Sequence, residues 1–159
     1  DQDLNSAMQN SVNWYFQAID SQLGINRVQE FLNKIEYGNQ TTSSNLDLYW
    51  SDFSLKISPL EQVTLLKKFN TNEFHLNFQN VFSVKNAIKI ASTPNGNFYG
   101  KTGTGRVNGQ DINGWVIGYV ETSDNSYYFA TNIQSDSNAT GKKAFEITSD
   151  ILKKLHIWN

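Results

Sequence analysis

Apolar residues at the start of the chain recur every three or four positions, which is the spacing of one face of an α-helix. The pattern predicts one helix that ends at Gly24 and buries a single stripe of side chains: Leu4, Met8, Val12, Tyr15, Phe16 and Ile19. Ser11 and Asn13 flank this stripe, so both are expected inside that helix. Because serine and asparagine are poor helix-interior residues, the pair belongs either to the solvated face, which the pattern alone favours, or to a functional site.

Three more helices are predicted before residue 90. A loose capping box, Asn26 with Gln29, predicts the start of the second helix, and the Tyr-Gly-Asn sequence at 37–39 predicts its end. The Ser-Pro-Leu-Glu sequence at 58–61 combines an N-cap, a first-turn proline and a glutamate that can reciprocate, so a third helix is expected there. A weaker fourth helix is predicted over residues 77–89.

The second half of the chain changes to the two-residue period of β-strands. Strands are predicted over residues 97–104, 112–122 and 126–134, with turns between them, followed by a helix over residues 141–155. Helices, then antiparallel strands, then a helix packed on the sheet indicate an α+β fold with a three-stranded sheet.

Composition excludes several classes of function but says less about the fold. The 159 residues carry a net charge of −2 and no basic block, so nucleic acid is a poor candidate partner. The absence of cysteine excludes disulfides, thiol nucleophiles and cysteine-ligated zinc, and no metal-ligand spacing or cofactor motif stands out. No apolar run is long enough to span a membrane. The chain begins at Asp1 and its single methionine is Met8, so we expect a piece of a longer protein.

The sequence Lys-Thr-Gly-Thr-Gly at 101–105 is the strongest candidate for chemistry. Its glycine spacing fits neither a phosphate-binding loop nor a dinucleotide-binding motif, and it lies on a predicted strand. Lys101, Thr102 and Thr104 offer an ammonium and two hydroxyls, while Gly103 allows close approach of a ligand or another backbone. Such a strand suits an anionic, acyl-type ligand, although a glycine-rich strand end facing solvent has about equal odds.

Four motifs in order resemble those of the penicillin-recognising serine family. They are Ser11-Val12-Asn13, the Tyr-Gly-Asn at 37–39, the run from Ser54 to Gln62 and Lys101-Thr102-Gly103, and Gly-Trp and Gly-Tyr-Val follow at 114–115 and 118–120. The resemblance covers essentially the whole chain. It points to the branch that class D β-lactamases share with BlaR/MecR sensor-transducers, and residues 3–16 are most similar to MecR-type methicillin sensors.

The resemblance has one departure, since the acylated serine of the family lies in a Ser-x-x-Lys motif. No serine of this chain has a lysine three positions later. The family pattern places that motif upstream of Asp1. Residues 1–159 are therefore expected to be the C-terminal part of one penicillin-binding sensor domain, mostly helical over 1–90, with antiparallel strands over 91–135 and the C-terminal helix over 136–159.

The resemblance also implies roles for individual residues. Ser11 would relay a proton near the nucleophile and the leaving β-lactam nitrogen, and Lys101 would supply positive charge. Thr102 and Thr104 would bind the ligand carboxylate beside Gly103, and the Thr104 N–H would form half of the oxyanion hole. Asn13 replaces the apolar residue usual in class D hydrolases. Its amide would favour a protonated lysine in the first motif over the carbamate that serves as the base for deacylation.

These roles imply a receptor and not an enzyme: a sensor acylated by a β-lactam without efficient turnover, which induces resistance genes. Its other partners would be the membrane segments and zinc protease domain of the same transducer, with this domain outside the cell membrane. Two alternatives remain open. The chain could belong to a class D β-lactamase, or it could be a noncovalent module that binds peptide carboxylates along the strand at 101–105.

Overall fold

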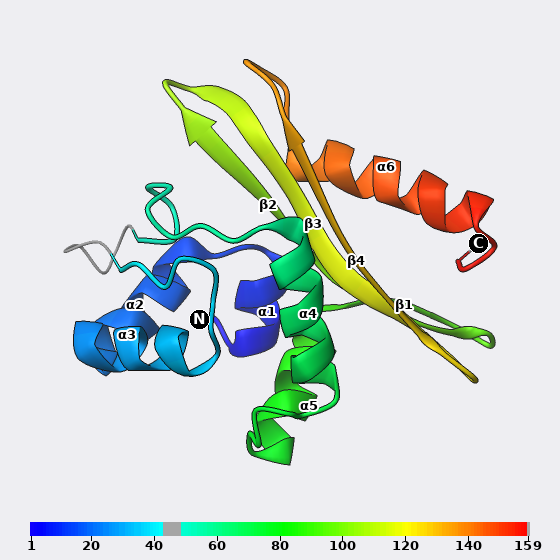
Figure 1. Cartoon of the computed structure of the whole chain (residues 1–159), viewed down its shortest axis with the longest axis horizontal. Helices are drawn as coiled ribbons and strands as arrows, with labels where there is room; N and C mark the ends of the chain where they lie inside the picture. The colour runs from blue at the N-terminus through cyan, green and yellow to red at the C-terminus, as the bar shows by residue number, and fades with distance from the viewer. Residues whose placement is uncertain (43–48, 159) are drawn as a thin grey trace. The chain divides into compact units, whose positions relative to one another are not determined.

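The computed structural model describes residues 1–42 and 49–158. They form two compact units, one of residues 1–42, 49–61 and 68–88 and the other of residues 62–67 and 89–158. The first unit is helical and the second is built on a sheet (Figure 1), so the predicted α+β class is confirmed.

Among the described residues, four helices lie wholly in the first unit: α1 (Leu4–Gln9), α2 (Asn13–Leu23), α3 (Ile25–Lys34) and α5 (Phe78–Ala87). Helix α4 (Pro59–Asn70) belongs to both units, because its residues 62–67 group with the second. Helix α1 packs against α5, and α2 packs against α3. Val28 and Leu32 of α3 are buried with Tyr49, and the partly buried Tyr37, Trp50 and Leu55 surround them. The Trp50 indole N–H donates to the Asp20 carboxylate at 3.1 Å, which satisfies the polar edge of that ring.

The second predicted helix is present as α3, but two details of the helix predictions for this unit are wrong. The single helix expected up to Gly24 is broken at residues 10–12 into α1 and α2. Helix α3 begins after Gly24, which makes no side-chain cap, and not at an Asn26 capping box. Gln29 instead holds the following loop, because its amide N–H donates to the Gln40 carbonyl at 2.6 Å and its amide oxygen accepts from the Thr42 hydroxyl at 2.7 Å.

The start of α4 is confirmed in detail. The Ser58 backbone N–H donates to the Glu61 carboxylate at 2.8 Å, and the Glu61 backbone N–H donates to the Ser58 hydroxyl at 3.2 Å. This is a complete capping box, with Pro59 at the first helical position. The predicted fourth helix is also present as α5, capped by Asn77.

Replacing Ser58 by alanine should lower the free energy of unfolding by about 1 kcal/mol, because the Glu61 backbone N–H loses the hydroxyl that accepts its hydrogen bond. The hydrogen bonds from Ser58 lower the pKa of Glu61 below its ordinary 4.5. The share of this stabilisation that depends on the Glu61 charge should therefore be present above pH 4.5 and should disappear as the pH falls through the depressed pKa, so Ser58→Ala should cost less at acid pH. Urea titrations at pH 7 and pH 3 test this, and an equal loss at both values would contradict it.

The second unit contains four antiparallel strands in the order β1 (Lys89–Thr93), β2 (Gly96–Val107), β3 (Gln110–Thr122) and β4 (Ser126–Gln134). The predicted three-stranded sheet is wrong, because β1 follows α5 directly and pairs with the start of β2. Five residues carry little period-two signal of their own. The Pro94-Asn95 turn before Gly96 is the local signal for this hairpin, and the sequence prediction did not use it. Strands β2 and β3 are also longer than predicted, since the turn between them is confined to Asn108 and Gly109.

Helix α6 (Gly141–Lys154) lies along one face of this sheet (Figure 1). Phe98, Val120 and Leu152 form the buried core between them. The Phe98 ring stacks on Phe145 of α6 at 5.8 Å and meets Trp158 edge-on at 5.5 Å. On the opposite face, Tyr99 stacks on Tyr119 at 4.7 Å.

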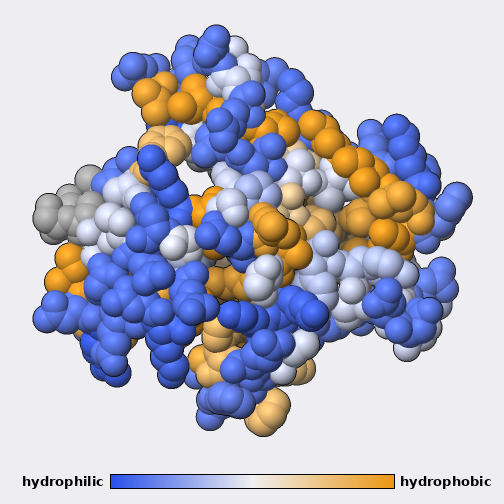
Figure 2. All heavy atoms as spheres, viewed as in Figure 1, coloured by the Kyte–Doolittle hydropathy of each residue, from blue (hydrophilic) through white to orange (hydrophobic). Residues whose placement is uncertain are grey.

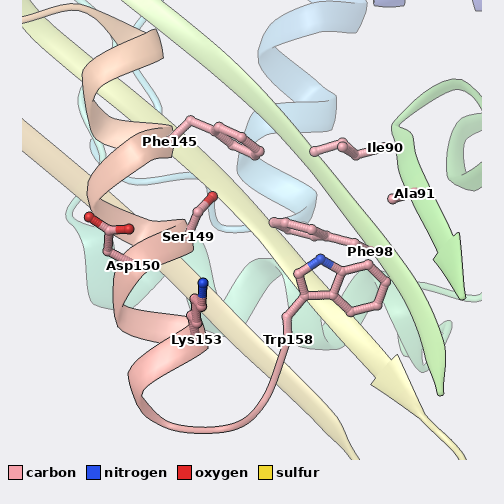
Figure 3. Close-up of a pocket in the computed structure, with 8 residues that line it drawn as sticks. All are labelled: Ile90, Ala91, Phe98, Phe145, Ser149, Asp150, Lys153 and Trp158. Atoms are coloured by element: carbon pink, nitrogen blue, oxygen red, sulfur yellow. The ribbon is translucent and has the colours of Figure 1, made fainter.

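A small pocket of about 330 Å³ remains beside this core, between α6 and the paired ends of β1 and β2 (Figure 3). Phe98, Phe145 and Trp158 point into it, with Ser149, Asp150 and Lys153 on the side of α6. The surface over α6 also shows hydrophobic residues beside hydrophilic ones (Figure 2), and Ile151 of this helix and Leu155 just after it are exposed. The pocket is an incompletely filled part of the core, because its floor consists of core side chains.

No helix in the described part of the chain is long and apolar enough to cross a membrane.

Candidate functional site

Strand β2 presents the Lys-Thr-Gly-Thr-Gly sequence along an incompletely covered side. Pairing with β1 is confined to residues 96–99 of β2, whereas pairing with β3 continues to Val107. From Gly100 onward, β3 is thus the only strand neighbour of β2 among the described residues. The backbone of residues 101–105 therefore borders a side of the sheet where a ligand can approach it.

The side chains of this segment alternate between the two faces of the sheet. Thr102 and Thr104 share the face of Phe98, which packs on α6, and Lys101 lies on the other face with Tyr99. The Lys101 ammonium donates to the Thr102 carbonyl at 2.9 Å, and burial lowers the pKa of Lys101. A partly desolvated lysine on the strand can both stabilise an anion and move a proton.

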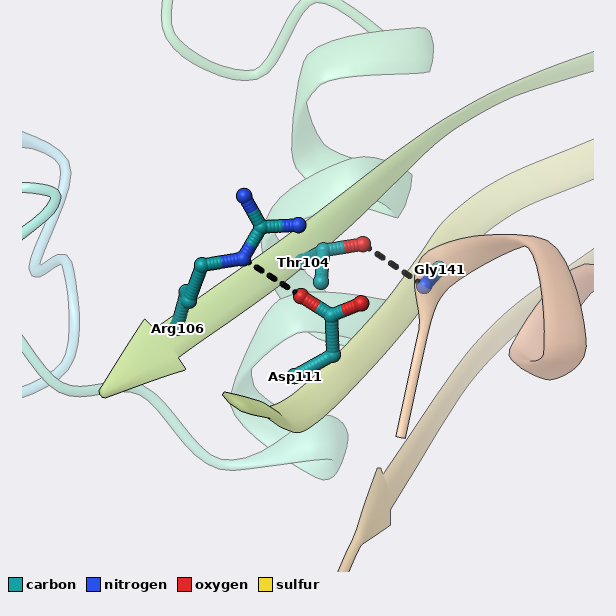
Figure 4. A network of polar contacts seen from close by, with 4 residues as sticks. All are labelled: Thr104, Arg106, Asp111 and Gly141. Carbon is teal, nitrogen blue, oxygen red and sulfur yellow. Dashed lines mark hydrogen bonds and ion pairs between the residues drawn. The ribbon is translucent and has the colours of Figure 1, made fainter. Parts of the chain in front are cut away.

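The N-terminus of α6 is fastened to this strand. The Gly141 backbone N–H donates to the Thr104 hydroxyl at 2.9 Å (Figure 4). A Cβ atom on Gly141 would lie 2.6 Å from the Gly103 carbonyl oxygen, so only glycine permits this approach. Gly114, opposite Thr104 on β3, makes equal room for the Thr140 carbonyl, which would lie 2.4 Å from a Cβ atom there.

Thr104 consequently has a structural task in addition to the predicted one. Its hydroxyl accepts from Gly141, and a hydroxyl that accepts one hydrogen bond still has a proton to donate. Sequence reasoning missed Gly141 as a residue of the site. The only signal was its place after Thr140 at a helix start, because the contact joins residues 37 positions apart.

Ser11 lies at a helix end and not inside a helix, which corrects the prediction. The Ser11 N–H donates to the Met8 carbonyl at 3.3 Å, and the Val12 N–H donates to the Ala7 carbonyl at 2.9 Å. This pair of bonds is a Schellman motif that closes α1, and it places Ser11 at a φ of 52°. The side chain is therefore held at a sharp corner of the chain, exposed to solvent.

The left-handed conformation at Ser11 gives a stability prediction. Glycine adopts positive φ without the steric cost that a side chain pays, which is about 1 kcal/mol. Ser11→Gly should therefore raise the free energy of unfolding by up to about 1 kcal/mol while removing the hydroxyl. Urea unfolding measures this change in the free energy of unfolding. Ser11→Ala is the matched control, because it removes the hydroxyl but keeps a side chain at positive φ. If the glycine and alanine variants were equally stable, the backbone at this position would not be strained.

Asn13 also lies outside the predicted helix interior. It is the first residue of α2, it is exposed, and Val12 before it makes no side-chain cap. Ser11 and Asn13 are thus brought together at the corner between α1 and α2. Lys101, Thr102, Gly103 and Thr104 are brought together on β2 of the other unit.

Within the described residues no three histidine, aspartate or glutamate side chains gather as a metal site would require. His75 and His156 are both exposed, at the ends of turns with positive φ.

Comparison with known proteins agrees with the motifs. The sequence profile of the family described as "Penicillin binding protein transpeptidase domain" matches residues 1–153. The methicillin resistance mecR1 protein of Staphylococcus aureus is 44% identical over 157 residues, which are 99% of this chain and 27% of that protein. This chain thus spans about a quarter of the length of that curated relative.

Two solved structures show the same fold. The C-terminal domain of the Bacillus licheniformis BlaR penicillin-receptor matches 99% of this chain and 64% of its own, with 46% identity and a TM-score of 0.94. A class D β-lactamase from Bacillus subtilis matches 98% of this chain and 63% of its own, with 37% identity and a TM-score of 0.89. The predicted class D β-lactamase-like fold and the resemblance to BlaR/MecR sensors are confirmed.

Proposed function

The chain belongs to the penicillin-binding protein transpeptidase family, and we propose that it is the C-terminal part of a β-lactam sensor domain. The domain is acylated by the antibiotic, is not efficiently deacylated, and signals to induce resistance genes. The observation that carries this proposal is the Lys101–Thr104 segment of β2, with its desolvated lysine and its uncovered side, in a chain 44% identical to a methicillin resistance protein.

In this proposal the nucleophile is a serine in a Ser-x-x-Lys motif elsewhere in the protein. Its hydroxyl oxygen attacks the β-lactam carbonyl carbon, the ring C–N bond breaks, and the nitrogen takes up a proton relayed through Ser11. Lys101 supplies a positive charge near the oxyanion as it forms. The Thr104 N–H is one of the two hydrogen-bond donors to that oxyanion. Thr102 and Thr104 hold the ligand carboxylate beside Gly103, where no side chain obstructs it.

The same proposal places the domain outside the cell, joined through membrane segments to a zinc protease domain. The length of the mecR1 relative, of which this chain matches 27%, leaves ample sequence for such parts. The resemblance to class D β-lactamases supports a second candidate, an enzyme that hydrolyses β-lactams.

Intact mass spectrometry of the protein that joins this chain to its Ser-x-x-Lys segment separates the candidates. After exposure to benzylpenicillin, a sensor should retain one covalently bound penicillin for hours. Turnover within seconds would establish the β-lactamase and contradict the sensor. Saturable binding without any covalent adduct would contradict both and support a noncovalent carboxylate-binding module.

Asn13 is the residue that we expect to separate a sensor from a hydrolase. Its amide oxygen can accept from the lysine of the first motif and favour the ammonium, which cannot form the carbamate needed for deacylation. Asn13→Val should therefore speed deacylation of the penicillin adduct, followed as loss of the covalent mass over time. Asn13→Gln, which keeps an amide, serves as the control. An unchanged lifetime in Asn13→Val would remove this explanation for slow deacylation.

A further inference from the structure

An ion pair between β2 and β3 lies near the C-terminal end of β2. The Arg106 Nε donates to the Asp111 carboxylate at 2.7 Å, and this carboxylate also raises the pKa of Arg106 (Figure 4). The Asp111 side chain is only 24% exposed, whereas that of Arg106 is 65% exposed. Asp111 is thus the more buried residue of the pair, and Arg106 is accessible to solvent.

A β-bulge creates this pair. Up to Gly105 the strands pair in one register, with Gly105 opposite Asn113, and then Arg106 lies opposite Asp111. Ile112 is the extra residue on β3, and without the bulge it would face Arg106 in place of Asp111. The Ala139 N–H donates to the Asp111 carbonyl at 2.8 Å, so the loop before α6 holds Asp111 in place.

The bulge leaves β2 regular, so Arg106 shares the face of Thr102 and Thr104. Only Nε of the guanidinium is used by Asp111, and its two terminal nitrogens extend beyond the ion pair (Figure 4). Since a guanidinium has five N–H donors, it can keep the bond to Asp111 and bind a second anion. Asp111 then acts as a positioning residue that fixes the direction of Arg106.

We infer that Arg106 is a specificity-determining residue, which favours β-lactams that carry a second anionic group on the side chain away from the ring carboxylate. This inference rests on the proposed function. A ligand with its carboxylate at Thr102 and Thr104 and its carbonyl at the Thr104 N–H must extend along β2. Arg106 is two residues beyond Thr104, or about 7 Å along the strand, which is the reach of an acyl side chain.

Carbenicillin and benzylpenicillin test the inference, because they differ by one carboxylate on that side chain. The measurement is the second-order acylation rate constant of each, in the protein that includes the Ser-x-x-Lys segment. Arg106→Gln should lower the ratio of the carbenicillin constant to the benzylpenicillin constant by about threefold at low salt, because an exposed charge pair is lost. Arg106→Glu should lower the ratio further, whereas Arg106→Lys should retain most of it.

Lys142→Gln is the matched control, because it removes one positive charge near the start of α6 without touching β2. A ratio that falls equally in Lys142→Gln and Arg106→Gln would mean that only net charge matters, and would overturn the inference. An unchanged ratio in Arg106→Gln would overturn it as well. Failure of benzylpenicillin to acylate the unsubstituted protein would instead overturn the proposed function, so the two failures are distinguishable.

Discussion

Replacing Lys101 by glutamine should slow acylation by benzylpenicillin about 100-fold in the protein that carries the Ser-x-x-Lys segment. In the proposed reaction this ammonium supplies positive charge while the oxyanion forms, and electrostatic stabilisation by one positioned group is worth a factor of this order. Burial makes the charge harder for solvent to replace. The measurement is the rate of covalent adduct formation by mass spectrometry, with Lys142→Gln as the control for net charge.

The pH dependence of acylation gives a second view of the same residue. Because burial lowers the pKa of Lys101 below its ordinary 10.5, the ammonium should be lost on the alkaline side sooner than an exposed lysine would lose it. Acylation should fall with it, and Lys101→Arg should shift this loss to higher pH. A wild-type rate in Lys101→Gln, in a variant that shows a native circular dichroism spectrum, would exclude Lys101 from the reaction.

The second large effect is expected in the core of the sheet. Phe98 is 2% exposed, and its ring contacts Phe129, Phe145 and Trp158. Phe98→Ala should therefore cost about 3 to 5 kcal/mol of unfolding free energy, through lost burial and the cavity that remains. This cavity would join the pocket beside α6, which Phe98 already lines.

Urea unfolding measures this effect, and Phe78→Ala is the matched control. Phe78 is 80% exposed at the start of α5, so the same substitution there should cost little. Similar losses at the two positions would mean that the core of the second unit does not limit its stability. Acylation need not be measured, because the comparison concerns packing alone.

Sequence reasoning succeeded where one local signal decided the structure. The Ser-Pro-Leu-Glu start of α4 and the strands β3 and β4 are predicted from neighbouring residues alone, and the structure contains all three. The break at Ser11 was missed because a Schellman motif leaves no glycine signal when serine occupies its left-handed position. The apolar residues on either side of it still fit a helical period.

The candidate site also has a part that could be predicted from the sequence and a part that could not. Its chemistry is legible in the sequence, because Lys101, Thr102 and Thr104 are consecutive or alternate on one strand. The contacts that hold these residues in place cannot be predicted in this way. Thr104 is bonded to Gly141, which lies 37 positions later in the sequence, and the bulge at Ile112 determines that Asp111 faces Arg106. Neither relation has a local pattern from which it could be predicted.

The attachment of α6 to β2 has a mechanical consequence. At its first residue the helix meets Gly103 and Thr104, and just beyond its end Trp158 packs on Phe98 of the same strand. The 14 residues of α6 span about 21 Å, and the six steps from Phe98 to Thr104 span about 20 Å. Helix α6 and this segment of β2 therefore have about the same length and contact each other at both ends, through Gly141 with Thr104 and through Trp158 with Phe98. Lys101 lies midway between these two contacts. Bending or twisting the strand at Lys101 would require the helix to deform with it, so α6 braces the groups of β2 that are proposed to meet the ligand.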